Sequence, residues 1–141
     1  MTLSVYIAAS SRDLERVRWA QQALVAVGAT LAHDWTQTLA HDERAMNRRD
    51  RSRLASECIE GVRSCGLFWM LAPPCPSCGA WSELGVAIQR VERPIIIVSG
   101  TVEQRMQSLF TDAPEVSHHT SDNAAVALIA ATVRQRRGRC A

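Results

Sequence analysis

One stretch of the chain, PSCGAWSELGVA at residues 76–87, decides which fold the sequence predicts. The residues just before it, 67–71, read LFWML and predict a buried strand. After it the apolar residues recur at helical spacing: Leu84, Ala87, Ile88 and Val91. Glu83 is therefore expected in the first turn of a helix that follows a strand and a Pro/Gly loop. In an open α/β sheet this place is the carboxyl edge, where ligands bind.

The position of Glu83 suits chemistry that needs an ionised carboxylate. A helix N-terminus favours the charged form, and a positioned carboxylate is a nucleophile in covalent glycosyl transfer. A structural role explains the same position, because an acidic residue there complements the helix dipole. The position alone leaves both interpretations open.

Apolar runs alternate with helical patterns along the whole chain. Strands are predicted at residues 3–9, 30–33, 67–71, 95–98 and 116–120, and helices at residues 14–27, 53–64, 83–91, 101–110 and 123–133. Residues 34–47 show no clear period and predict a loop. We therefore expect a three-layer α/β fold with helices on both faces of a sheet.

The alternation predicts a doubly wound, five-stranded parallel sheet that is flavodoxin- or Rossmann-like, with strand order 2-1-3-4-5. In this order the ligand site lies at the switch point between strands 1 and 3, beside Ser10 and the loop before Glu83. We expect residues 1–133 to form a single domain and residues 134–141 to form a basic flexible tail.

The composition is that of an ordinary globular protein, with 47% hydrophobic residues, 21% charged residues and a net charge of +2. All sixteen basic residues are arginines. The lack of lysine excludes a Walker-type phosphate loop, a Schiff-base lysine and a lysine base. No apolar run has the length of a membrane span and no signal peptide is recognised, which predicts a cytoplasmic protein with no membrane partner. The small net charge gives no indication of a nucleic-acid partner.

The five cysteines are expected to be free thiols in the cytoplasm. Cys75 and Cys78 have C-x-x-C spacing, but no second pair completes a zinc site. We therefore expect neither a metal site nor a cofactor.

The predicted topology gathers polar residues at the switch point. Strand 1 and its loop supply Tyr6, Ser10, Ser11 and Arg12, the loop and helix after strand 3 supply Ser77, Gly79, Trp81 and Glu83, and the preceding helix supplies Glu57. Hydroxyls, a guanidinium and two helix N-termini form a candidate phosphate or sugar-hydroxyl site. Each residue also has an ordinary role, because aromatic residues pack, serines cap helices and surface carboxylates pair with arginines.

Two motifs in this order resemble a known family. VYIAAS at residues 5–10 and GAWSELGVA at residues 79–87, followed by RPII at residues 93–96, are similar to the nucleoside 2-deoxyribosyltransferases. That family includes the 2′-deoxynucleoside 5′-monophosphate N-glycosidases. The resemblance implies an enzyme that cleaves or transfers the N-glycosidic bond of a (2′-deoxy)nucleoside or its 5′-monophosphate, through a covalent glycosyl-Glu83 intermediate and without a cofactor.

The resemblance also implies roles for the chemical centre. Glu83 matches the glutamate that attacks the anomeric carbon, and Tyr6 matches the tyrosine that holds it. The acidic position on the preceding helix, usually Asp in the family, aligns best with Glu57, which would protonate the departing base. Trp81 or Trp35 is expected to stack on the base.

The remaining matches concern the sugar 5′ end. Ser10 and Arg12 match positions near it in the monophosphate hydrolases, and Ser77 matches a serine that contacts the 5′-phosphate. The deoxyribosyltransferases tend to carry an aspartate at the position of Ser77. This departure favours a 5′-phosphorylated substrate over transfer between free nucleosides.

The resemblance further implies a homodimer or larger homo-oligomer, because family members usually assemble in this way. An alternative is a catalytically weak or inactive nucleotide-binding or sensing module on the same fold. A third interpretation is a nucleic-acid binder that uses the arginines of residues 44–53 and the tail, but the acidic residues among them favour a solvated face.

Overall fold

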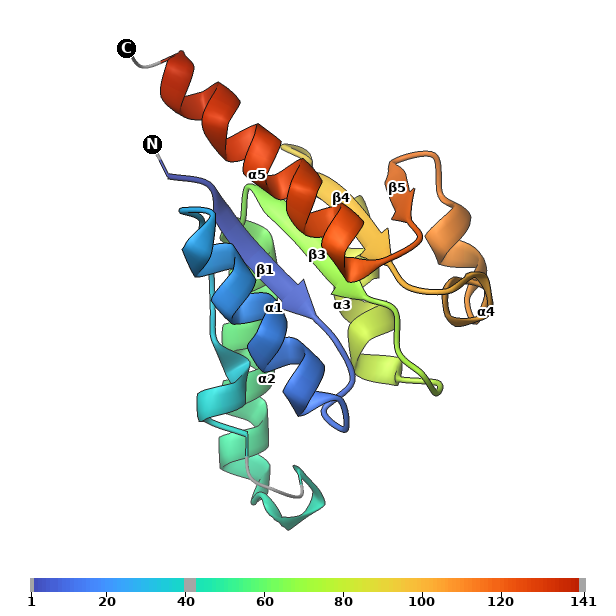
Figure 1. The fold of residues 1–141 in the computed structure, drawn as a ribbon. Helices are drawn as coiled ribbons and strands as arrows, with labels where there is room; N and C mark the ends of the chain where they lie inside the picture. Colours follow the sequence, from blue (N-terminus) through green and yellow to red (C-terminus); the bar gives the residue numbers. More distant parts are fainter. Residues whose placement is uncertain (1, 40–42, 140–141) are drawn as a thin grey trace.

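The computed structural model describes residues 2–39 and 43–139 and contains an all-parallel, five-stranded sheet (Figure 1). The strands are β1 (Ser4–Ala8), β2 (Thr30–Leu31), β3 (Leu67–Leu71), β4 (Ile95–Ser99) and β5 (Val116–His119), in the order β2-β1-β3-β4-β5. The predicted α/β class and strand order are confirmed. The central strand β3 is buried along its whole length, as its continuous apolar run predicts.

Helices cover both faces of the sheet. They are α1 (Leu14–Ala26), α2 (Arg48–Ser64), α3 (Cys78–Ile88), α4 (Val102–Arg105) and α5 (Asp122–Gly138). The helices α1 and α5 lie side by side on one face, and α2 and α3 lie on the other (Figure 1). In the described part of the chain, no helix is long and apolar enough to span a membrane.

Helix α2 begins five residues before its predicted start at Arg53. Asn47 caps it, because its side-chain oxygen accepts a hydrogen bond from the backbone N–H of Asp50 at 2.9 Å, and its amide donates to the Asp50 carboxylate at 2.8 Å. The first turn of α2 carries polar residues only, so no apolar period marks the start of this helix in the sequence. Before it, residues 34–47 form two short 3₁₀ turns, Trp35–Gln37 and Glu43–Ala45, and residues 40–42 lie outside the described part.

Two further elements differ from the sequence prediction. The helix expected at residues 101–110 is divided into α4 and a 3₁₀ turn, Leu109–Asp112. Helix α5 continues to Gly138, so most of the expected flexible tail is helical, since arginine and glutamine are good helix formers. Residues 140–141 of the expected tail lie outside the described residues.

Arg16 of α1 ties the carboxyl ends of β3 and β4 to α5. Its guanidinium donates hydrogen bonds to the carbonyls of Ala72 at 2.7 Å and Ser99 at 3.3 Å, and to both carboxylate oxygens of Asp122 at 2.7 and 2.9 Å. Asp122 also accepts a hydrogen bond from the Ser99 hydroxyl at 2.6 Å. Burial alone raises the pKa of Asp122, but the hydrogen bonds from Arg16 and Ser99 outweigh it and hold the pKa below its usual value.

We expect Asp122→Asn to lower the free energy of unfolding by about 1–3 kcal/mol at pH 7, because it removes the charge that Arg16 and Ser99 hydrogen-bond. A depressed folded-state pKa contributes stability above the unfolded pKa and loses it as pH falls. Urea unfolding at pH 7 and pH 3 should therefore show that the free energies of unfolding of wild type and Asp122→Asn differ less at pH 3. Glu115→Gln is the control, because Glu115 makes only a partly exposed pair with Arg93 at 3.2 Å. An equal loss in both variants would contradict this role of Asp122.

Candidate active site

A hydrogen bond between Tyr6 and Glu83 joins the first strand to α3. The Tyr6 hydroxyl donates to Glu83 Oε1 at 2.7 Å. Tyr6 is fully buried, and its ring stacks on that of Phe68, with centroids 6.0 Å apart and planes inclined by 7°. Tyr6 and Phe68 are register partners in the adjacent strands β1 and β3. The sheet therefore fixes the position of the Tyr6 side chain, and the Tyr6 hydroxyl fixes the orientation of the Glu83 carboxylate.

Glu83 lies in the second turn of α3, and not in the first turn as predicted, because the helix begins at Cys78. The field of a helix terminus falls off within the first turn. The hydrogen bond from Tyr6, and not the helix dipole, is consequently the described interaction that favours the ionised carboxylate.

Burial controls the ionisation of both partners. It raises the pKa of Glu83 to about 7, against the lowering effect of the Tyr6 hydrogen bond. Burial also raises the pKa of Tyr6, and the nearby Glu83 and Cys58 raise it further. Tyr6 therefore remains a hydrogen-bond donor, while Glu83 changes its charge close to neutral pH.

Helix α2 crosses directly over the Tyr6 ring, and Gly61 allows this close approach. A Cβ atom at Gly61 would lie 2.9 Å from Cδ2 and Cε2 of Tyr6 and 2.8 Å from Cβ of His33. These distances are shorter than ordinary van der Waals contacts, so a larger residue would displace Tyr6 or the helix.

A cavity of about 950 Å³ opens beside Glu83 at the carboxyl edge of the sheet, and we call it the Glu83 cavity. Its lining includes residues 9–12 after β1, residues 75–80 with Ser82 and Glu83 from the β3–α3 segment, Trp35, and one face of α2. The structure thus brings together six of the nine predicted site residues: Ser10, Ser11, Arg12, Ser77, Gly79 and Glu83. Tyr6 joins them through its hydrogen bond to Glu83.

The two loops of this cavity leave helix N-termini without side-chain caps. Ser77 precedes α3 and Asp13 precedes α1, and neither side chain makes a capping hydrogen bond. Ser10 is almost fully buried, and its Oγ accepts a hydrogen bond from the backbone N–H of Arg12 at 3.3 Å. Hydroxyls and helix N-termini in this arrangement suit the binding of an anion.

The structure places Glu57 on a different, smaller cavity of about 350 Å³. Its carboxylate lies 3.8 Å from Arg53 Nε and 3.9 Å from His33 Nε2. Successive residues of an α-helix point about 100° apart. The residue of α2 that faces Tyr6 is therefore the next one, Cys58.

Cys58 is the site residue that the sequence reasoning missed. It lines the Glu83 cavity, and its thiol interacts with the Tyr6 hydroxyl and the Glu83 carboxylate. Burial raises the pKa of Cys58 to about 11, although the hydrogen bond with Tyr6 opposes this shift, so the thiol is neutral at pH 7. The available signal was helical spacing, because Cys58 lies one turn before Gly61 on the face that covers Tyr6.

The two candidate stacking residues have different surroundings. Trp81 is partly buried against the hydrophobic core and does not line the Glu83 cavity. Trp35 does line it, and its indole N–H donates to the Ile7 carbonyl at 2.8 Å. The cavity therefore offers the face or edge of Trp35, and not of Trp81, to a ligand.

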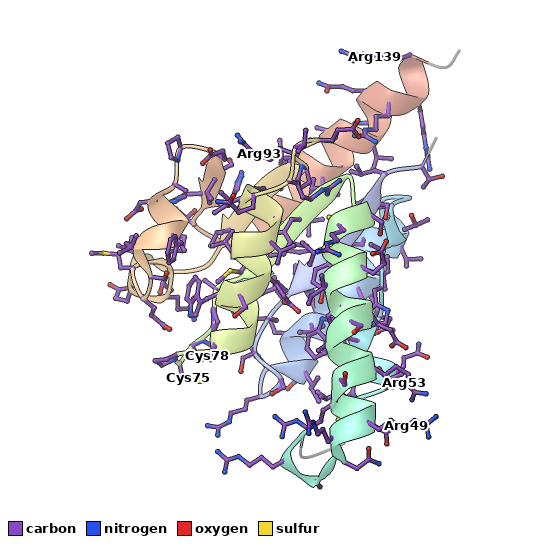
Figure 2. The ribbon with its side chains drawn as sticks, turned by 180° about the vertical axis from the view of Figure 1, so that it is seen from behind. Arg49, Arg53, Cys75, Cys78, Arg93 and Arg139 are labelled. Atoms are coloured by element: carbon purple, nitrogen blue, oxygen red, sulfur yellow. The ribbon has the colours of Figure 1, made fainter. Side chains whose placement is uncertain are left out.

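The described cysteines, Cys58, Cys65, Cys75 and Cys78, are free thiols, and Cys140 lies outside the described part. Figure 2 shows Cys75 and Cys78 next to each other at the start of α3. Within residues 2–39 and 43–139, no group of three His, Cys, Asp or Glu side chains is arranged to hold a metal ion.

No protein-family model and no curated protein sequence matches the chain. Solved structures do match it. A 2-deoxyribosyltransferase from Bacillus psychrosaccharolyticus superposes with a TM-score of 0.67 at 16% identity, over 89% of this chain and 95% of that one. A CMP N-glycosidase from Clostridium botulinum superposes with a TM-score of 0.56 at 15% identity, over 89% of this chain and 96% of that one. A conserved protein from Enterococcus faecalis gives 0.63 at 18% identity, over 96% and 99%.

These matches show that the chain has the fold of a 2-deoxyribosyltransferase and of a CMP N-glycosidase over nearly its whole length. The resemblance that the two motifs predict is thereby confirmed for the fold. The chemistry of this chain is a separate question, because one fold supports many activities and function depends on the site.

We expect Gly61→Ala to lower the free energy of unfolding by about 1–3 kcal/mol, because the added methyl group would overlap the Tyr6 ring. Gly85→Ala is the matched control, since Gly85 lies within α3 and a Cβ there meets no atom within 4 Å. The control should gain up to about 1 kcal/mol from helix propensity. Thermal and urea unfolding measure both changes, and a stabilised Gly61→Ala would show that α2 does not press on Tyr6.

Proposed function

We propose that this chain cleaves or transfers the N-glycosidic bond of a (2′-deoxy)nucleoside or its 5′-phosphate, with Glu83 as the nucleophile. The observation that carries the proposal is the partly buried Glu83 carboxylate, held by Tyr6 on the wall of a large cavity. The two structural neighbours with stated activities, a 2-deoxyribosyltransferase and a CMP N-glycosidase, support the reaction class.

The proposed reaction has two steps. Oε1 of Glu83 accepts the Tyr6 hydrogen bond, so Oε2 attacks the anomeric carbon through an oxocarbenium-like transition state. The C1′–N bond breaks, its electron pair leaves with the base, and a covalent glycosyl-Glu83 ester forms. Water, or a second base, then attacks the anomeric carbon and releases Glu83 as a carboxylate. The fixed Tyr6 side chain keeps the carboxylate oriented during both steps.

The departing base needs a proton in this scheme. The family resemblance assigns that proton to Glu57, whose carboxylate lines the smaller cavity and lies 3.8 Å from Arg53 Nε and 3.9 Å from His33 Nε2. The neutral thiol of Cys58 lies next to the reacting pair and supplies an S–H donor there. We therefore propose that the departing base takes its proton from solvent water in the open cavity, that Cys58 supports the orientation of Tyr6, and that Glu57 contributes less than its alignment implies.

We also propose a homodimer or larger assembly in the cytoplasm, as the family resemblance implies. Exposed apolar side chains at Met106, Leu109 and Phe110 offer a surface that such an assembly would cover, and the free thiols fit a reducing compartment. The alternative is a nucleotide-binding module without turnover, which the absence of Glu57 from the lining of the Glu83 cavity favours.

We expect the wild-type protein to release free base from at least one member of a panel of ribo- and deoxynucleosides and their 5′-monophosphates. Glu83→Gln should lower this rate at least about a thousandfold, because it removes the nucleophile. Glu57→Gln should remain within about threefold of wild type. Chromatography of the products measures both, and a second free base in the mixture distinguishes transfer from hydrolysis. Binding without base release would establish the module instead.

We expect kcat/KM to rise with pH through about 7, because only the ionised Glu83 is a nucleophile and its pKa is about 7. Tyr6→Phe keeps the ring that stacks on Phe68 but removes the hydrogen bond that lowers this pKa. The acidic limb should then move to higher pH, and the maximal rate should fall by about tenfold or more. A limb that stays in place in Tyr6→Phe would show that Tyr6 does not control Glu83.

A further inference from the structure

Helix α2 presents one continuous face to the Glu83 cavity. The residues of this face recur at spacings of three and four: Arg48, Arg51, Ser52, Ala55, Cys58 and Ile59. The end nearest Glu83 is small or apolar, because Cys58 lies beside the carboxylate. The opposite end is basic. A ligand that lies along α2 therefore meets the reactive carboxylate first and arginines last.

The four arginines in the first half of α2 divide into two sets. Arg53 lies outside the Glu83 cavity and makes ion pairs with Asp50 and Glu57. Figure 2 shows Arg49 and Arg53 on the side of α2 that is turned away from Cys75 and Cys78. Arg48 and Arg51 line the Glu83 cavity, and no acidic side chain in the described residues forms an ion pair with either of them.

The charge of the cavity wall is strongly uneven. Arg12, Arg48 and Arg51 all line it, and Glu83 is its acidic side chain among the described residues. The whole chain carries a net charge of only +2, so this concentration of arginine is local. Guanidinium groups bind phosphate through paired hydrogen bonds and remain charged at every physiological pH. The wall therefore suits a ligand with several negative charges at one end.

Helix geometry indicates how far the basic end lies from the chemistry. Each helical residue advances 1.5 Å, so Arg51 and Arg48 start about 10 and 15 Å from Cys58 along the axis. Five bonds separate the anomeric carbon of a nucleotide from its first phosphorus, which limits their separation to about 6 Å. On a sugar held at Glu83, a single 5′-phosphate would therefore stay within about 6 Å of the anomeric carbon, and only further phosphates would extend towards Arg51 and Arg48. The cavity, at about 950 Å³, is at the upper end of the range for small-molecule sites.

We propose that the substrate of this site is a nucleotide with a 5′-diphosphate or a longer phosphate chain. Its first phosphate lies at the loops of Ser10 and Ser77, and its outer phosphates are bound by Arg48 and Arg51. This assignment rests on the proposed function, because it takes the anomeric carbon to lie at Glu83. The outer phosphates remain far from the reacting bond, so their binding energy is the same before and during the reaction. It should lower KM and leave kcat unchanged.

The test compares one nucleoside as its 5′-mono-, di- and triphosphate, for each common base and both sugars, at constant ionic strength. The wild-type protein should show a kcat/KM for the diphosphate that is about 10- to 100-fold above that for the monophosphate. The double variant Arg48→Gln/Arg51→Gln should lose this preference through a higher KM for the diphosphate. Arg49→Gln is the matched control from the opposite side of α2, and it should keep the preference.

Calorimetric titration of Glu83→Gln with the same nucleotides gives a second readout that needs no turnover. Tighter binding of the diphosphate, lost in the added Arg48→Gln/Arg51→Gln pair, would support the inference even if no base were released, in which case only the proposed function fails. Base release with no preference for the longer phosphate chain would overturn the inference and leave the proposed function intact. A preference that survives in the double variant, or base release from oligonucleotides alone, would also overturn it.

Discussion

A partly buried carboxylate loses part of its hydration, and in this fold the Tyr6 hydroxyl replaces some of that hydration at Glu83. The 2.7 Å hydrogen bond depends on features that are far apart in the sequence. The strand order places β1 beside β3, so Tyr6 stacks on Phe68 and donates its hydrogen bond to Glu83 in the second turn of α3. The missing side chain at Gly61 lets α2 cover the ring and exclude water from it. The carboxylate of Glu83 therefore has a raised pKa and a fixed orientation. This combination suits a nucleophile that works near neutral pH.

The network that stabilises the sheet and the cavity proposed for catalysis lie on opposite faces of the same sheet. Arg16, Ser99 and Asp122 form their network on the α1–α5 face, where they fix the carboxyl ends of β3 and β4. The loops that leave this edge on the α2–α3 side surround the Glu83 cavity. Along that cavity the wall changes from small and apolar to basic. A ligand with an uncharged glycosidic centre and a charged phosphate chain matches this gradient.

The fold could be predicted from the sequence, because a strand that is buried on both faces consists of a continuous apolar run. The strands β1, β3 and β4 have such runs. Tyr6, Ser10, Ser77 and Glu83 were found for the same reason, since they follow or lie within those clear elements. The rotation of α2 could have been predicted from helical spacing, because Leu54, Ala55, Cys58, Ile59 and Val62 recur on one face. Glu57 was chosen instead through its alignment with the family. One helical position separates Glu57 from Cys58, and that step of about 100° decides which side chain meets Tyr6. The second-turn position of Glu83 was missed as well, although Ala80 lies four residues before Leu84 and extends the same apolar face towards Cys78.

The central claim is that Glu83 forms a covalent bond with the sugar, and peptide mass spectrometry tests it most directly. The protein would be mixed with a nucleotide whose 2′-fluoro substituent slows the second step, quenched in acid and digested. We expect a mass increase equal to the fluorinated glycosyl group on the peptide that contains Glu83, and none in Glu83→Gln. Base release with no adduct on this peptide, and with inversion at the anomeric carbon of the product, would contradict the claim, because a direct attack of water leaves no ester on the protein.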